Sequence, residues 1–367
     1  STGQAGRATG GRIILTIAAK DLREALRNKV ALLILLSSLV MILLNSALPL
    51  LLRSRIEPTV LVYDPNHSEL LRILVEQSEL VIGISNSREA MEAELGELPQ
   101  TYLGLSLPVD FDQRLARGET VLLESSVMHW ADPKEVEGLA GLFSVEVERL
   151  SAGKVSLSSP ARLVYPSPAG FGQGLMVAQI LAFILFITGI TLTPLLLVEE
   201  KEAHTLEALL VSPARTGQVV AGKALVGLFY GFLAAAVVLL LNRYLFAHWW
   251  VVLLAVIAGT AFGVALGLLI GALSNNPTTV GLWGGMVLMV LVSAGLLSLF
   301  SNANWPAWLR ELLAWLPSGA LIRMIRLAML GAPDGRLIWG GAGLLMGLAV
   351  ILFFLANLRL RRAIGAG

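Results

Sequence analysis

Several runs of about 20 residues in this chain contain almost no charged side chain. That length lets an α-helix cross a hydrocarbon layer about 30 Å thick, and a helix pairs all of its own backbone groups in lipid. The composition agrees, since only 14% of the 367 residues are charged, against about 25% in soluble domains. The sequence therefore predicts an α-helical integral membrane protein with six transmembrane helices. We place them at 30–52, 171–198, 224–241, 249–273, 280–299 and 337–358.

The segment 53–170, between the first two spans, has a different composition. It holds 18 acidic and 10 basic residues, whereas the rest of the chain is basic. Strand-like runs alternate here with charged helical runs, which is typical of an α/β domain. The expected strands are 59–63, 80–84, 101–107 and 120–127, and the expected helices are 68–77, 88–95, 110–117 and 133–149. We expect an inserted α/β domain of about 100 residues, with Gly118 closing a helix.

The distribution of Lys and Arg predicts the orientation of the chain. Six spans place both termini on one side, and positive charge collects on the cytoplasmic side. One side carries twelve such residues, whereas the short loops of the other side carry five. We therefore predict a multi-pass protein of the cell (cytoplasmic) membrane, with the N-terminus 1–29 and the tail 359–367 cytoplasmic and the 53–170 domain outside.

Two further segments are predicted to be amphipathic. Residues 12–29 place apolar side chains on one helical side and basic ones on the other, which fits a helix lying in the membrane interface; a short solvated helix before the first span is the alternative. Residues 305–330 mix Trp with charged side chains and are interrupted at Pro317. We expect them to form an external amphipathic hairpin, either interfacial or re-entrant, that does not cross the bilayer.

The charged segment 199–213 lies between two apolar runs. Leu206, Leu209 and Leu210 share one side of a helical pattern, acidic residues cover the rest, and Pro213 ends the pattern. A helix of this polarity cannot enter lipid, so we expect it at the surface, where another protein can bind it.

Several kinds of chemistry are disfavoured by the sequence. Gly217, Gly222 and Lys223 fit the spacing of a phosphate-binding loop, but Ala224 stands where Ser or Thr must bind magnesium. The chain has no cysteine, and its four histidines lack metal-ligand spacing. The acidic inserted domain does not fit nucleic acid. We predict no catalytic, metal or cofactor site, so any ATP must be bound by another chain.

The polar side chains inside the spans suggest what kind of molecule could pass. The centres of all six spans lack Asp, Glu, Lys and Arg, whereas ion-coupled transporters usually hold buried ionisable groups. The candidate path-lining residues are Gln173, Gln179, Thr188, Thr191 and Ser293. They suit an amphipathic, drug-like or lipid-like substrate, or they bond to their own helix backbone. Gly263, Gly267 and Gly271 form two G-x-x-x-G steps, which fit packing within the chain or contact with another subunit.

The sequence EKEAHTLEALLVSP at 200–213, followed by Gly222 and Lys223, carries a family resemblance. Together with the six spans it resembles ABC transporter permeases of the type-2 exporter family, in particular the subgroup with a large extracytoplasmic domain. The run PVDFDQRLARGE at 108–119 is similar to that domain in the family. His204 departs from the family pattern, which usually has Gly there.

The resemblance implies a function. The chain would be the transmembrane subunit of an ATP-driven exporter, not an enzyme alone, with ATP and magnesium held by separate ABC ATPase subunits. A coupling helix at 199–213 would contact the ATPase through Glu200, Glu202, Thr205, Leu206, Glu207, Leu210 and Pro213. The partners implied are those ATPases, a second permease in a homo- or heterodimer, and membrane lipids. The alternative is a membrane-anchored sensor or assembly protein acting through its inserted domain.

Overall fold

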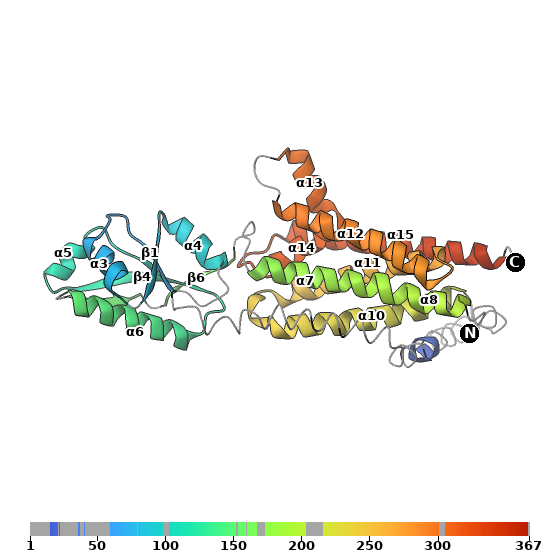
Figure 1. The fold of residues 1–367 in the computed structure, drawn as a ribbon, viewed down its shortest axis with the longest axis horizontal. Coiled ribbons are helices and arrows are strands. Elements are labelled where there is room, and N and C mark those ends of the chain that lie inside the picture. The colour runs from blue at the N-terminus through green and yellow to red at the C-terminus, as the bar shows by residue number, and fades with distance from the viewer. Residues whose placement is uncertain are drawn as a thin grey trace, which may run out of the picture. The chain divides into compact units, whose positions relative to one another are not determined.

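The computed structural model describes residues 15–20, 22, 36, 40, 59–78, 80–97, 103–151, 153–158, 160–166, 173–202, 216–300 and 305–365. The chain divides into two compact units. The α/β unit comprises Asn45–Met176 and Met329–Gly331, and the helical unit comprises the remainder. Both are drawn in Figure 1.

A single mixed sheet organises the α/β unit. Its strands are β1 (Thr59–Tyr63), β2 (Val81–Ser85), β3 (Leu103–Ser106), β4 (Thr120–Met128), β5 (Lys154–Leu157) and β6 (Arg162–Val164). The order is β2-β1-β3-β4-β5, and β6 also pairs with β4. Strands β2 and β3 run parallel to β1, whereas β4 is antiparallel to β3 and parallel to β5 and β6.

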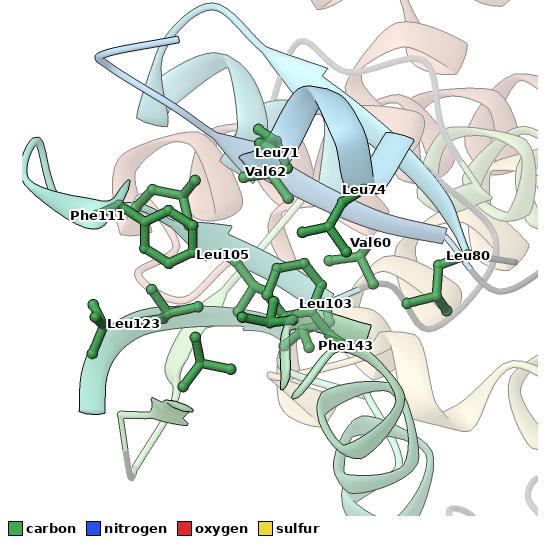
Figure 2. Close-up of a cluster of buried hydrophobic side chains, with 14 of the residues drawn as sticks. Val60, Val62, Leu71, Leu74, Leu80, Leu103, Leu105, Phe111, Leu123 and Phe143 are labelled. Atoms are coloured by element: carbon green, nitrogen blue, oxygen red, sulfur yellow. The ribbon is translucent and has the colours of Figure 1, made fainter. Parts of the chain in front are cut away.

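Helices cover both faces of this sheet. They are α3 (Glu69–Gln77), α4 (Arg88–Glu97), α5 (Phe111–Ala116) and α6 (Pro133–Leu150). Because side chains alternate along a strand, Val60 and Val62 point to the face covered by α3 and α6 (Figure 2), while Leu61 packs with Met91 on the opposite face. Phe143 of α6 is fully buried in the larger core.

The secondary structure predicted for this unit is largely confirmed. The four expected strands and four expected helices are present, with ends shifted by at most three residues. Gly118 has φ 73° after α5, which is the left-handed conformation expected of a glycine that closes a helix. Strands β5 and β6 were not predicted, because they have only four and three residues.

The helical unit consists of long apolar helices. Its elements are α7 (Gln173–Ile187), the π-helix η1 (Thr188–Leu192), α8 (Thr193–Glu202), α10 (Thr216–Leu241), the short η2 (Arg243–Leu245), α11 (Trp249–Leu273), α12 (Pro277–Phe300), α13 (Ala307–Trp315), α14 (Pro317–Leu327) and α15 (Gly335–Gly365). Five segments of the described chain are long and apolar enough to cross a membrane: Gly174–Glu202, Gly217–Leu241, Trp249–Leu273, Pro277–Leu297 and Gly335–Arg362. The predicted first span, 30–52, lies outside the described residues except for Leu36 and Val40.

Two predicted boundaries need correction. Helix α10 begins at Thr216, so Lys223 lies inside it and not before it. Helix α8 of the second span runs on to Glu202, so the coupling helix does not begin as a separate element at Glu199. Helix α13 ends at Trp315 and α14 starts at Pro317, so the predicted break is present, and α14 is mostly buried against α11, α12 and α15. Whether this hairpin is interfacial or re-entrant stays a prediction.

Candidate functional site at the charged end of the second span

The helix of the second span is irregular in its middle. Between α7 and α8 the backbone forms the π-helix η1, and Pro194 follows two residues after it. Proline has no N–H, so the carbonyl of Ile190 loses its usual donor at Pro194. Single turns of π-helix inside α-helices occur often at functional sites. The regular α-helix of this span is therefore interrupted near its middle.

The glycines of α11 lie directly against this interruption. A Cβ atom at Gly267 would lie 2.0 Å from the carbonyl oxygen of Gly189, and one at Gly263 would lie 2.9 Å from that of Leu185. At Gly271, a Cβ would lie 2.9 Å from the Cα of Pro194. Small residues at this spacing let two helix backbones approach closely. The G-x-x-x-G steps thus pack within the chain, which decides between the two interpretations of the sequence.

A buried ion pair joins α8 to α10. The Nζ atom of Lys223 lies 3.0 Å from Oε2 of Glu200 and donates a hydrogen bond of 2.7 Å to the carbonyl oxygen of Leu196. The two side chains are only 1% and 9% exposed. In such surroundings, a charge is stable only when it is paired and hydrogen-bonded. The sequence match to a phosphate-binding loop therefore uses a lysine that already holds two helices together.

A second lysine joins α8 to the end of α11. Lys201 donates from Nζ to the carbonyl oxygens of Gly271, Ala272 and Ser274, at 2.8, 3.0 and 2.9 Å. The last carbonyls of a helix have no partner within the helix and carry its negative dipole end. The ammonium group of Lys201 donates hydrogen bonds to these carbonyls and places a positive charge at the negative end of the helix dipole. The last turn of α8 is therefore attached to both α10 and α11.

The N-terminal amphipathic segment packs onto the same place. Residues 15–20 are helical, and Ala18 and Leu22 pack against a buried cluster that includes Leu196 and Tyr230. The Nζ atom of Lys20 lies 3.9 Å from Oε1 of Glu200. An interfacial position for this helix stays a prediction. Its apolar side meets protein here.

The structure places only two of the seven predicted ATPase contacts. Glu200 is buried in the ion pair with Lys223, and Glu202 is exposed at the end of α8. Five others lie outside the described residues, namely Thr205, Leu206, Glu207, Leu210 and Pro213. Their role in binding an ATPase remains a prediction.

The predicted path-lining residues have different surroundings. Thr191 donates to the carbonyl of Ile187, and Ser293 donates to that of Val290 at 3.1 Å, so both bond to their own helix. Thr188 is buried and Gln179 is half-buried. Within the described part of the chain, Oγ1 of Thr188 and Oε1 of Gln179 have no hydrogen-bond partner. The side chain of Gln173, at the start of α7, is outside the described structure.

Lys201 and Lys223 were not predicted as functional residues. The third span was expected to begin at Ala224, which left Lys223 in a loop. A lysine preceding an apolar run gives no sign of whether it is inside the helix. One sequence feature could have indicated the pair: Glu200 follows the predicted second span and Lys223 precedes the predicted third, so two opposite charges are expected at the same membrane side of consecutive spans.

Comparison with curated proteins gave no match. The family model described as ABC-2 family transporter protein matches residues 133–358, from the start of α6 to near the end of α15. This match covers more than half of the chain and includes helices α8, α10 and α11 of the site just described. The chain therefore belongs to the ABC-2 family of transporter proteins and is a multi-pass membrane component of an ABC transporter.

Proposed function

We propose that this chain is the permease subunit of an ATP-driven exporter, working with separate ABC ATPase subunits that bind ATP and magnesium. The observation that carries the proposal is the double attachment of the last turn of α8. Glu200 pairs with Lys223 of α10, and Lys201 binds the end of α11. A force applied to the segment that follows Glu202 would therefore move three helices together.

The π-helix η1 is the part of the second span that could bend when α8 moves. Regular helices are stiff, whereas an interrupted one can bend between two packed arrangements. Closure of the ATPases would press on 203–213, and α8 would transmit that displacement to η1. The exporter action would follow from a change in the bend near Thr188 and Gly189.

An amphipathic, drug-like or lipid-like substrate fits the uncharged polar side chains of this span. Gln179 and Thr188 supply hydrogen-bonding groups among apolar neighbours, and neither carries a charge. Apolar pockets with a few polar groups are typical of sites for such molecules. A second permease, identical or similar, would complete the path beside α12. The side chains of Met286 and Met289 on this helix are exposed in the single chain, so a second permease could contact them.

The decisive experiment is purification of the full chain from its native membranes in mild detergent, followed by an ATPase assay. We expect an ATPase with a complete phosphate-binding loop to co-purify. Replacing Glu207 with Lys should abolish coupled ATPase activity and transport while the chain remains inserted. The matched control is Glu137→Lys, the same charge reversal at an exposed position of α6, which should leave both unchanged.

Two results would contradict the proposal. Transport that survives Glu207→Lys would remove the coupling role from 199–213. A clean preparation without any ATPase would favour the sensor or assembly function of the α/β unit.

A further inference from the structure

The guanidinium group of Arg323 in α14 lacks an anionic partner. No ion pair joins it to an acidic side chain in the described part of the chain, and its Nε and Nη2 atoms are buried without a hydrogen-bond partner there. The acidic residues of 305–340 are Glu311 and Asp334, and both are exposed. A buried charge costs free energy unless it is paired. An anion bound to the guanidinium group of Arg323 would therefore be stabilising.

Trp315 holds the guanidinium in place. The Cζ atom of Arg323 lies 4.6 Å from the centroid of the Trp315 ring, a cation–π arrangement. On α15, a Cβ atom at Gly340 would lie 2.8 Å from the same ring, so the absence of a side chain there leaves room for it. The guanidinium group of Arg323 thus stacks on the Trp315 ring. Its planar arrangement of N–H donors suits the oxygens of a phosphate or carboxylate.

The positive charge extends along α14. Arg326 is half-buried one turn after Arg323, and residues three apart share a helix side. Burial lowers the pKa of both guanidinium groups, because removal from water disfavours the charged form. Arginine nevertheless stays charged at neutral pH. A bound anion would offset this loss of hydration.

Three exposed apolar side chains on α13 end at Trp315, which contacts the guanidinium group of Arg323. Trp308, Leu312 and Trp315 follow one another at spacings of four and three residues and are 67%, 53% and 43% exposed. That spacing places them along one side of the helix. Exposed apolar side chains beside a cation fit a molecule with both an acyl chain and an anionic head.

We propose that Arg323, with Arg326 and Trp315, binds the phosphate headgroup of an anionic phospholipid whose acyl chain lies along Trp308 and Leu312. The site does not depend on the proposed transport activity. It needs neither ATP nor an ATPase subunit, so the two proposals fail in different experiments.

Native mass spectrometry of the full purified chain in mild detergent tests the site. The probes are phosphatidylglycerol, phosphatidylcholine of the same acyl chains, and inorganic phosphate. We expect phosphatidylglycerol to bind more tightly than phosphatidylcholine, and inorganic phosphate to bind far more weakly. Arg323→Gln should weaken phosphatidylglycerol binding by about tenfold, as expected for loss of charge-assisted hydrogen bonds. The matched control is Arg310→Gln, an exposed arginine of α13, which should leave binding unchanged.

Arg323→Lys provides a second variant should Arg323→Gln fail to fold. It keeps the charge but loses the planar fork and the stacking on Trp315, so we expect an intermediate loss of phosphatidylglycerol binding. Unchanged binding in both variants would overturn the proposal. So would an equal loss in Arg310→Gln, equal binding of phosphatidylcholine, or inorganic phosphate binding as tightly as the lipid.

Discussion

Lys223 and Glu200 form an ion pair across two helices, with Nζ 3.0 Å from Oε2 and both side chains almost fully buried. Glu200 is also the first residue of the family-like sequence at 200–213. The same carboxylate that sequence reasoning assigned to a protein interface therefore fixes the end of α8 within the chain. This relationship sets the first prediction.

Removing one partner of this pair should destabilise the helical unit. Lys223→Met leaves the carboxylate of Glu200 without its nearest cation, and Glu200→Gln leaves a buried ammonium group. We expect either change to lower the free energy of unfolding by about 3–5 kcal/mol. Denaturation of the detergent-solubilised chain measures it.

The double variant separates the pair from other effects. Lys223→Met combined with Glu200→Gln should cost clearly less than the sum of the single changes, because no charge is then left unpaired. Glu202→Gln, at an exposed position in the same turn, should change the free energy by less than about 0.5 kcal/mol. Additive costs would show that the two charges do not interact.

A methyl group at Gly267 should separate α11 from η1. Its Cβ would lie 2.0 Å from the carbonyl oxygen of Gly189, and backbone atoms cannot move aside cheaply. We expect Gly267→Ala to lower the free energy of unfolding by about 1–3 kcal/mol or more, measured as a lower Tm. It should also lower transport, because the two helices could no longer keep their contact.

Gly285 in α12 provides the matched control. A Cβ atom there meets nothing within 4 Å, and alanine is the better helix former by about 1 kcal/mol. Gly285→Ala should therefore leave the Tm unchanged or raise it slightly. Equal effects at the two positions would mean that the close approach of α11 to η1 does not matter for stability.

Loss of the Lys201 ammonium group should loosen the end of α11. Lys201→Met leaves the carbonyls of Gly271, Ala272 and Ser274 without this donor. Hydrogen bonds from a charged group contribute about 1.5–3 kcal/mol each at most. We expect faster amide hydrogen exchange in the last turn of α11, with little change at its start near Trp249.

Glu202→Gln serves here too, since it alters a neighbouring exposed charge and leaves Lys201 intact. Exchange in the last turn of α11 should be unchanged in this variant. If Lys201→Met also left that exchange unchanged, the ammonium group would have no role in holding the end of the helix.

Much of the fold could be predicted from local pattern. The alternation of Val60, Leu61 and Val62 reflects a strand with two covered faces, and the long apolar runs reflect spans. Strands β5 and β6 escaped prediction because four and three residues are too few to show a strand pattern, and only their pairing with β4 defines them. The extension of α8 to Glu202 escaped it because charged residues usually mark the end of a span.

The candidate site was predicted only in outline. The motif at 200–213 predicts a partner-binding segment, and that role stays a prediction because most of the segment lies outside the described residues. The positions of Lys201 and Lys223 in the helices gave no information about which backbone carbonyls they would meet. A side chain of four carbons can reach several partners, and packing selects among them.

The sequence by itself determined the class of this protein, because hydropathy, charge and the 200–213 motif are properties of neighbouring residues. Only the tertiary structure decided what the glycines of α11 and the charges at Glu200 and Arg323 meet. Gly267 lies against Gly189, Glu200 is paired with Lys223, and Arg323 stacks on Trp315. These contacts join residues from different helices, and the balance between burying a charge and pairing it is set by the neighbours that folding provides.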